Sequence, residues 1–366
     1  MKESPLDIAT DAPMSPQPER YAALALQLAT HCVNACPDRE SARARMAENI
    51  ARVRQKVAGS KAFIRQYSGE EARLVVLPEY FLTGFPMGDS VPAWRDKAAL
   101  EIDGPEYEAL GAIAADFDIY LAGNAYEADP HFPTLYFQCS FLLAPSGDVV
   151  LRYRRMISLS GPTPYDVWDR YLEIHGLEGV FPVADTPIGR IAAIASEEIL
   201  YPEIARCHAM RGAEIFIHST SEAGMPQDSI KEIARRARAL ENLAYVVSAN
   251  SAALTDIPVP AESTTGMSKV VDYHGHVMAE AMPGGESMVA NATIDLAALR
   301  ATRRQTGLTN MLSRQPFQAY AQSYAQAEFR APNGLLGESG VRLPERADFV
   351  AAQLSDIERL ARKGLI

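Results

Sequence analysis

Short apolar segments alternate with helix-like segments along most of this 366-residue chain, and this alternation constrains the fold more than any other feature. Residues 74–77 (LVVL) read as a buried strand that stops at Pro78, whereas residues 39–57 place apolar side chains at helical spacing. Further strands are expected at 22–29, 119–122, 136–143, 149–153, 191–195, 215–218, 245–249, 267–272, 276–280 and 287–295, and further helices from Tyr107 and over 203–212 and 228–243. The alternation predicts an α/β fold of mixed sheets covered by helices.

The two ends of the chain differ from this pattern. Residues 1–19 are polar and rich in proline, and we expect a flexible tail there. From about residue 301, two apolar stripes recur at helical spacing: Phe317, Tyr320 and Tyr324, and then a second stripe over residues 349–360. Such stripes indicate packing. We therefore expect a C-terminal extension over 301–366 that docks on the core, which spans 20–300, or on a neighbouring subunit.

Composition excludes several classes of function. The formal net charge is −11, with 46 acidic and 35 basic residues, which disfavours nucleic-acid partners because such proteins need a basic surface. No segment reaches the roughly 18 apolar residues of a membrane span, and the N-terminus lacks the apolar core of a signal peptide. The four cysteines and seven histidines show no metal-ligand spacing. The sequence predicts a cytoplasmic protein with no metal or cofactor.

Three segments carry side chains suited to chemistry at the ends of expected strands. They are LVVLPEY (residues 74–80) with GFP at 84–86, YRR (153–155) after the turn PSG (145–147), and GRIAAIASEE (189–198) with Pro202 beyond. RALEN (238–242) and VSAN (247–250) follow in the same order. The whole set resembles the nitrilase, or carbon–nitrogen hydrolase, superfamily from about residue 20 to residue 300. The resemblance implies an α-β-β-α sandwich that pairs into homodimers or larger homo-oligomers.

The resemblance also implies a role for each segment. In the family, a glutamate acts as general base, a lysine stabilises the developing oxyanion, and a cysteine attacks the nitrile or amide carbon to form a thioester. Glu79 stands at the position of the base. Arg155 stands where the family has lysine, and Ser196, six residues before Pro202, stands where it has cysteine.

The two departures change the expected chemistry. A serine hydroxyl is a weak nucleophile without a strong base, whereas a thiol ionises readily. Arginine keeps the positive charge but cannot release a proton near neutral pH. Losing a positioned proton-transfer group alone costs about 10²–10⁴ in rate. We therefore expect the usual thioester hydrolysis to be absent or slow.

Two further acidic residues are candidates for substrate binding. Asp166 ends the segment PTPYD (162–166), which resembles a family motif that carries an acidic residue, and Glu173 is its rival. Glu198 lies two residues after Ser196 and is expected to shape the pocket. Simpler interpretations exist for the three principal residues: a solvated carboxylate for Glu79, a surface arginine for Arg155, and a turn serine for Ser196.

Three functions remain open at this stage. The first is an enzyme whose site is repurposed for other acid–base or serine-based chemistry on a small molecule that carries an amide, nitrile or carboxylate. The second is a non-catalytic protein that binds a ligand or acts as a scaffold. The third is an ordinary amidase or nitrilase in an inactivated form.

Overall fold

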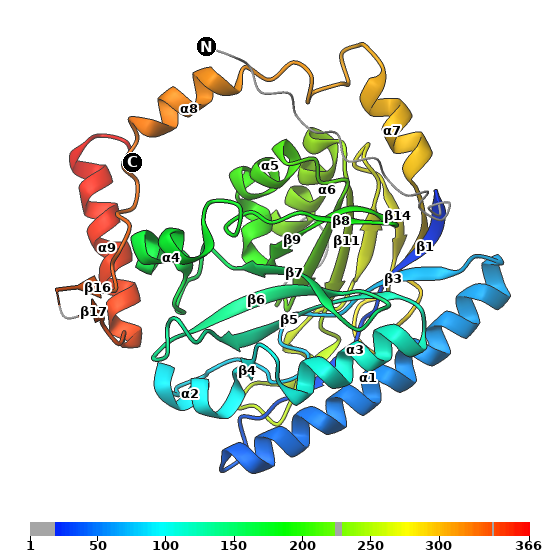
Figure 1. Cartoon of the computed structure of the whole chain (residues 1–366), viewed down its shortest axis with the longest axis horizontal. Coiled ribbons are helices and arrows are strands. Elements are labelled where there is room, and N and C mark those ends of the chain that lie inside the picture. Colours follow the sequence, from blue (N-terminus) through cyan, green and yellow to red (C-terminus); the bar gives the residue numbers. More distant parts are fainter. Residues whose placement is uncertain (1–18, 224–228, 339) are drawn as a thin grey trace, which may run out of the picture.

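Two mixed β-sheets form the centre of the molecule. The computed structural model describes residues 19–223, 229–338 and 340–366, so the predicted tail lies outside the described residues except for Glu19. Strands of the two sheets contact each other, and helices contact the outer side of each sheet. Figure 1 shows this arrangement, with α1 and α3 beside one sheet and α5 and α6 beside the other.

The larger sheet has the strand order β15-β1-β3-β5-β6-β7, with β4 paired to β5. The pairs β1–β3 and β3–β5 are parallel, and the remaining pairs of the path are antiparallel. The strands are β1 (Arg20–Ala25), β3 (Ala72–Val76), β4 (Leu100–Glu101), β5 (Tyr120–Ala128), β6 (Tyr136–Leu143), β7 (Val149–Arg154) and β15 (Asn291–Asp295). The parallel centre is buried on both faces, which explains its continuous apolar runs.

The second sheet has the order β14-β13-β11-β10-β9-β8. Its central strands β9, β10 and β11 are parallel, and its outer pairs are antiparallel. The strands are β8 (Ala184–Thr186), β9 (Gly189–Ala195), β10 (Ile215–Thr220), β11 (Tyr245–Asn250), β13 (Lys269–Val271) and β14 (Val277–Glu280). Because neighbouring parallel strands end at the same edge, residues that follow β9 and β10 lie close together.

The helices of the core are mostly capped by side chains at their N-termini. Asp38, Ser90, Ser229 and Asp295 accept hydrogen bonds from the first turns of α1, α2, α6 and α7. The helices are α1 (Arg39–Ser68), α2 (Val91–Ala98), α3 (Pro105–Asp116), α4 (Trp168–His175), α5 (Pro202–Met210), α6 (Ile230–Asn242) and α7 (Leu296–Arg304), with short 3-10 turns η1 (Pro164–Val167), η2 (Ser196–Leu200) and η3 (Ala261–Ser263). None of the helices in the described residues combines the length and the apolar character that a membrane crossing requires.

Most predicted elements are confirmed, including the β6–β7 hairpin, but several limits are wrong. The helix predicted over 39–57 continues to Ser68, because its second half also buries apolar residues such as Ile64. The strand predicted over 119–122 runs to Ala128. The strand predicted over 22–29 is divided: β1 ends at Ala25, and β2 (Ala29–His31) pairs with β12 (Ala253–Thr255) in a separate small sheet.

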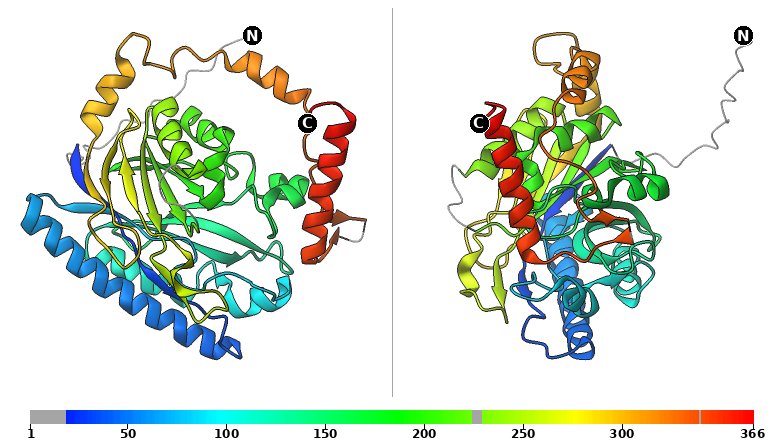
Figure 2. Two further views of the ribbon diagram at one scale, coloured as in Figure 1. Left: turned by 180° about the vertical axis from the view of Figure 1, so that it is seen from behind. Right: turned by 90° about the vertical axis from the view of Figure 1, so that its left-hand side faces the viewer.

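The C-terminal segment runs around the outside of the core (Figure 2). It contains α8 (Phe317–Ala325), the strands β16 (Leu336–Gly337) and β17 (Gly340–Val341), and α9 (Arg346–Arg362). The aromatic stripe on α8 is not buried in this chain, since Tyr320 and Tyr324 are exposed. Of the second stripe, Phe349 is buried, whereas Val350, Leu354 and Ile357 are exposed.

Candidate active site

Glu79, Arg155 and Ser196 line one cavity of about 260 Å³. They follow three different strands, β3, β7 and β9, and they reach the cavity from both sheets. Aromatic, amide and hydroxyl groups complete the lining, and these include Tyr80, Phe85, Tyr126, Tyr136, Gln138, Ser158 and Ser221. The structure therefore brings together the three residues that the sequence singles out. Their catalytic roles stay predictions.

Glu79 is buried at the centre of a chain of hydrogen bonds. Its side chain is 2% exposed. Gln138, on β6, donates from Nε2 to Glu79 Oε1 at 2.6 Å and to Asn124 Oδ1 at 2.9 Å. Arg155 Nη1 lies 3.4 Å from the same Glu79 oxygen. A buried carboxylate paired in this way is held in one orientation, as a general base requires.

Arg155 is held by protein groups on every side. Its Nε donates to the carbonyl of Ile157 at 2.6 Å, and Nη1 donates to Gln138 Oε1 at 2.6 Å as well as to Glu79. Its Nη2 donates to Glu197 at the cavity wall. Four of the five guanidinium N–H groups are thus occupied, which leaves one for a ligand. Arg155 supplies positive charge to the site but has little freedom to move.

Ser196 stands at a sharp turn, where β9 has ended and η2 begins. Its backbone φ is +48°, in the left-handed region that residues with a side chain rarely adopt. His218, on β10, contacts the Ser196 carbonyl through Nε2 at 2.8 Å, and its Nδ1 lies 2.8 Å from Ser248 Oγ. A carbonyl can only accept, so Nε2 donates, and this histidine fixes the backbone of Ser196. Strained turns of this kind are typical of nucleophiles presented at a strand end.

Glu198 lies outside the cavity lining and holds the segment that carries Arg155. The amides of Met156 and Ile157 donate to its Oε1 at 2.7 and 3.0 Å, and the Tyr153 hydroxyl donates to its Oε2 at 2.8 Å. Glu198 is fully buried and is not among the lining residues. Burial raises the pKa of this carboxyl to about 7. Glu198 thus helps to position Arg155, since it accepts from the two residues that follow that arginine.

Asp166 also lies outside the cavity lining. It sits in η1, where Thr163 donates to its Oδ2 from the backbone amide at 2.9 Å and from the hydroxyl at 2.7 Å. Arg330, from the C-terminal segment, donates to its Oδ1 at 2.6 Å. Its rival Glu173 is exposed on α4. Asp166 thus fastens the C-terminal segment to the core, and neither residue contacts the site.

Sequence reasoning missed two residues that shape the site. Gln138 lies within the buried strand β6, and no motif marks it. Glu197, which had no assigned role, pairs with Arg155 and lines both the main cavity and a second cavity of about 170 Å³ beside it. The sequence did offer one signal for Glu197, since it is an acidic residue directly after Ser196.

No group of three or more His, Cys, Asp or Glu side chains in residues 19–223, 229–338 and 340–366 is arranged to hold a metal ion.

Comparison with known proteins identifies the family. The family model described as carbon–nitrogen hydrolase matches residues 25–304. The omega-amidase NIT2-A of Xenopus laevis is 28% identical over 243 residues, which are 66% of this chain and 83% of that protein. The human omega-amidase NIT2 is 26% identical over 245 residues, which are 67% of this chain and 84% of that protein.

Solved structures agree on the fold. A carbon–nitrogen hydrolase from Helicobacter pylori matches with a TM-score of 0.61 at 20% identity and covers 83% of this chain and 98% of its own. Nit3 of Saccharomyces cerevisiae, a member of branch 10 of the nitrilase superfamily, matches with a TM-score of 0.60 at 20% identity and covers 83% of this chain and 100% of its own. The α/β fold with two mixed sheets is that of these proteins, and the chain belongs to the carbon–nitrogen hydrolase family of the nitrilase superfamily.

Proposed function

We propose that this protein hydrolyses a small, activated ester or amide through an acyl-serine intermediate, with Ser196 and Arg155 in place of the cysteine and lysine of its family. The observation that carries the proposal is the placement of Ser196 at a left-handed turn in the same cavity as the buried carboxylate of Glu79. Arg155 adds positive charge opposite that carboxylate. Thioester hydrolysis at the speed of a cysteine enzyme is not expected.

The reaction divides into two steps. Ser196 Oγ attacks the carbonyl carbon and its proton passes to Glu79; the bond to the leaving group then breaks, and the serine carries the acyl group. Water next attacks the acyl-serine, and Oγ leaves with the proton held by Glu79; the proton that water loses replaces the one that the leaving group takes up. Gln138 supports this role because its amide fixes one oxygen of Glu79 and leaves the other to receive the proton.

Acyl labelling tests the proposal directly. The protein is incubated with p-nitrophenyl acetate and analysed by intact-mass and peptide mass spectrometry. One acetyl group on Ser196 in the wild type, and its loss in Ser196→Ala, is the expected result. A wild-type protein that releases no nitrophenolate above the rate of Ser196→Ala would refute the proposal. Ser196→Cys with Arg155→Lys, assayed on amides, nitriles and carbamoyl compounds, then shows which substrates the pocket accepts.

A second candidate is a protein that binds such a molecule without turnover. The several hydrogen bonds of Arg155 favour this binding function, because a guanidinium held by Gln138, Glu197 and Ile157 forms part of the pocket wall. Thermal-shift screening of small carboxylates, amides and nitriles tests this function. A ligand at one hundred times its Kd stabilises by about 2.7 kcal/mol. Loss of the shift in Glu79→Gln assigns the ligand to this cavity.

The proposal includes a homo-oligomer in which residues 301–366 contact a second copy of the chain, with the α-β-β-α layers of each core stacked as in the family. The exposed apolar residues Tyr324, Val350 and Leu354 on α8 and α9 support it. Light scattering after size exclusion tests this point. Replacing Val350 and Leu354 by glutamate is expected to lower the mass to that of a monomer.

A further inference from the structure

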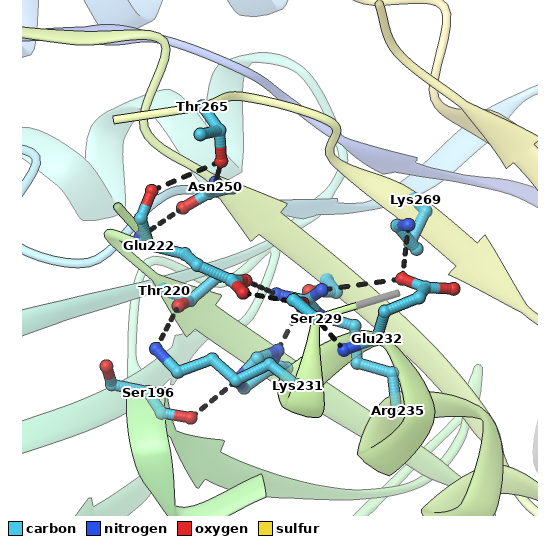
Figure 3. A network of polar contacts seen from close by, with 12 residues as sticks. Ser196, Thr220, Glu222, Ser229, Lys231, Glu232, Arg235, Asn250, Thr265 and Lys269 are labelled. Atoms are coloured by element: carbon cyan, nitrogen blue, oxygen red, sulfur yellow. Dashed lines mark hydrogen bonds and ion pairs between the residues drawn. The ribbon is translucent and has the colours of Figure 1, made fainter. Parts of the chain in front are cut away.

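Lys231 lies beside the candidate active site but belongs to none of the motifs described above. It stands in the first turn of α6, half-buried, with Nζ 3.4 Å from Thr220 Oγ1. Thr220 ends β10; its carbonyl accepts from the amide of Glu79 at 3.3 Å, and the next residue, Ser221, lines the cavity. Figure 3 shows the Lys231 side chain extending from α6 toward Thr220, on the side where Ser196 lies.

The charged side chains around Lys231 are occupied with other partners. Glu222 is paired with Arg235 at 2.5 Å and accepts from the Ser229 hydroxyl at 2.9 Å. Glu232 is paired with Lys269. In the described parts of the chain, Lys231 itself forms no ion pair within 4.0 Å, and Thr220 is its hydrogen-bond partner. The first turn of α6 is therefore fixed (Figure 3), while the Lys231 ammonium keeps N–H donors for a ligand.

Burial favours proton release from this ammonium. Burial lowers the pKa of Lys231; the charges of Glu79, Glu222 and Glu197 oppose this shift, and that of Arg235 adds to it. Glu79 and Glu197, whose charges act on Lys231, both line the cavity. A lysine with a lowered pKa releases a proton more readily than an ordinary lysine, whereas Arg155 cannot release one near neutral pH.

We infer that Lys231 is the general acid for the leaving group, a role that rests on the acyl-serine function proposed above. In the first step Glu79 takes the proton of Ser196, and the Lys231 ammonium gives a proton to the leaving nitrogen or oxygen as its bond to the acyl carbon breaks. In the second step water attacks the acyl carbon and gives a proton to the neutral Lys231 amine, while Ser196 Oγ leaves with the proton from Glu79. Each group returns to its starting state.

A series of phenyl acetates with progressively poorer leaving groups tests this role. p-Nitrophenolate leaves as an anion and needs no acid, whereas unsubstituted phenolate benefits from a proton donor. We expect Lys231→Met to acylate Ser196 from p-nitrophenyl acetate within about twofold of the wild type and from phenyl acetate about 10²-fold more slowly. Lys231→Arg, which keeps the charge, should show the same loss. Lys363→Met, at a half-exposed lysine directly after α9, should change neither rate.

The outcomes separate the two proposals. A wild-type protein that is not acylated at Ser196 overturns the acyl-serine function and this role with it. Acylation of the wild type with equal loss for both esters in Lys231→Met, or with no loss for either, overturns the role of Lys231 alone. A steeper dependence on leaving-group basicity in both Lys231 variants supports it, because a purely structural lysine would not change that dependence.

Discussion

The guanidinium of Arg155 lies 3.4 Å from the carboxylate of Glu79, and both side chains are more than nine-tenths buried. Each charge is therefore shielded from water and depends on the other for compensation. Gln138 bridges the pair, since it accepts from Arg155 and donates to Glu79, each at 2.6 Å. The three side chains form one unit, and removal of any member takes a hydrogen bond from each of the other two.

Replacement of Arg155 is expected to reduce stability strongly. Arg155→Met leaves the Glu79 carboxylate uncompensated, so we expect the free energy of unfolding to fall by about 3–5 kcal/mol. Urea denaturation followed by circular dichroism measures the change. Glu197→Gln is the control, because Glu197 pairs with the same arginine but is 30% exposed, and it should cost no more than about 1 kcal/mol. A loss below 1 kcal/mol in Arg155→Met would contradict the buried-pair interpretation.

Replacement of Ser196 is expected to show the strain of its backbone. Its φ of +48° is unfavourable for any residue with a Cβ, whereas glycine adopts it freely. We therefore expect Ser196→Gly to be more stable than Ser196→Ala by about 1 kcal/mol, measured by thermal and urea unfolding.

The control for this comparison is Ser248, which lies in the extended strand β11 and contacts the same histidine, His218. There the order should reverse, since glycine in a strand is less favourable than alanine by about 0.5–1 kcal/mol. Equal stabilities of the two Ser196 variants would show that the turn is relaxed.

The pH dependence of stability should carry a contribution from Glu198. Burial raises the pKa of this carboxyl from 4.5 to about 7, so between these values the folded protein binds more protons than the unfolded chain. The stabilising contribution of Glu198 is complete below pH 4.5 and is lost as the pH rises through about 7, with a slope of at most about 1.4 kcal/mol per pH unit. Unfolding of the wild type and Glu198→Gln across this range measures it. Parallel curves for the two proteins would contradict the raised pKa.

Local patterns in the sequence were sufficient to predict most strands, whereas the convergence of Glu79, Arg155 and Ser196 was predicted from the resemblance of their motifs to the family. Each of these residues follows a strand, but β7 is an antiparallel edge strand and β9 belongs to the second sheet, so strand order alone would not have brought the three residues together. The roles of Glu198 and Asp166 could not be predicted in the same way. The sequence shows an aspartate or glutamate but not whether its carboxylate binds a ligand or accepts hydrogen bonds from backbone amides. Only the positions of the Met156, Ile157 and Thr163 amides in the fold show that Glu198 and Asp166 do the latter.

Two further differences have physical causes that sequence patterns do not report. Gln138 lies in a strand that is buried along its whole length, so no alternation marks the side chain that faces the cavity. The second half of α1 contains Gly59, which weakens a helix prediction, but packing of Ile64 and Ser60 against the core maintains the helix. In both cases tertiary contacts override the local signal.

The link between Asp166 and Arg330 should determine how firmly the C-terminal segment is held. Arg330 Nη2 donates to Asp166 at 2.6 Å, and the amides of Asn333 and Leu335 donate to the carbonyls of Tyr165 and Asp166 at 2.9 and 2.8 Å. Asp166→Asn and Arg330→Met should therefore speed amide exchange at residues 333–335. In a double-mutant cycle the pair should show a coupling of about 0.5–3 kcal/mol, because the partners are in direct contact and Asp166 is buried.

The exposed pair Arg342–Asp348, at 2.7 Å, is the control, and its removal should change stability by no more than about 0.5 kcal/mol. Additive effects at Asp166 and Arg330, with unchanged exchange, would mean that the C-terminal segment is held by its backbone bonds and by Phe349 rather than by this ion pair.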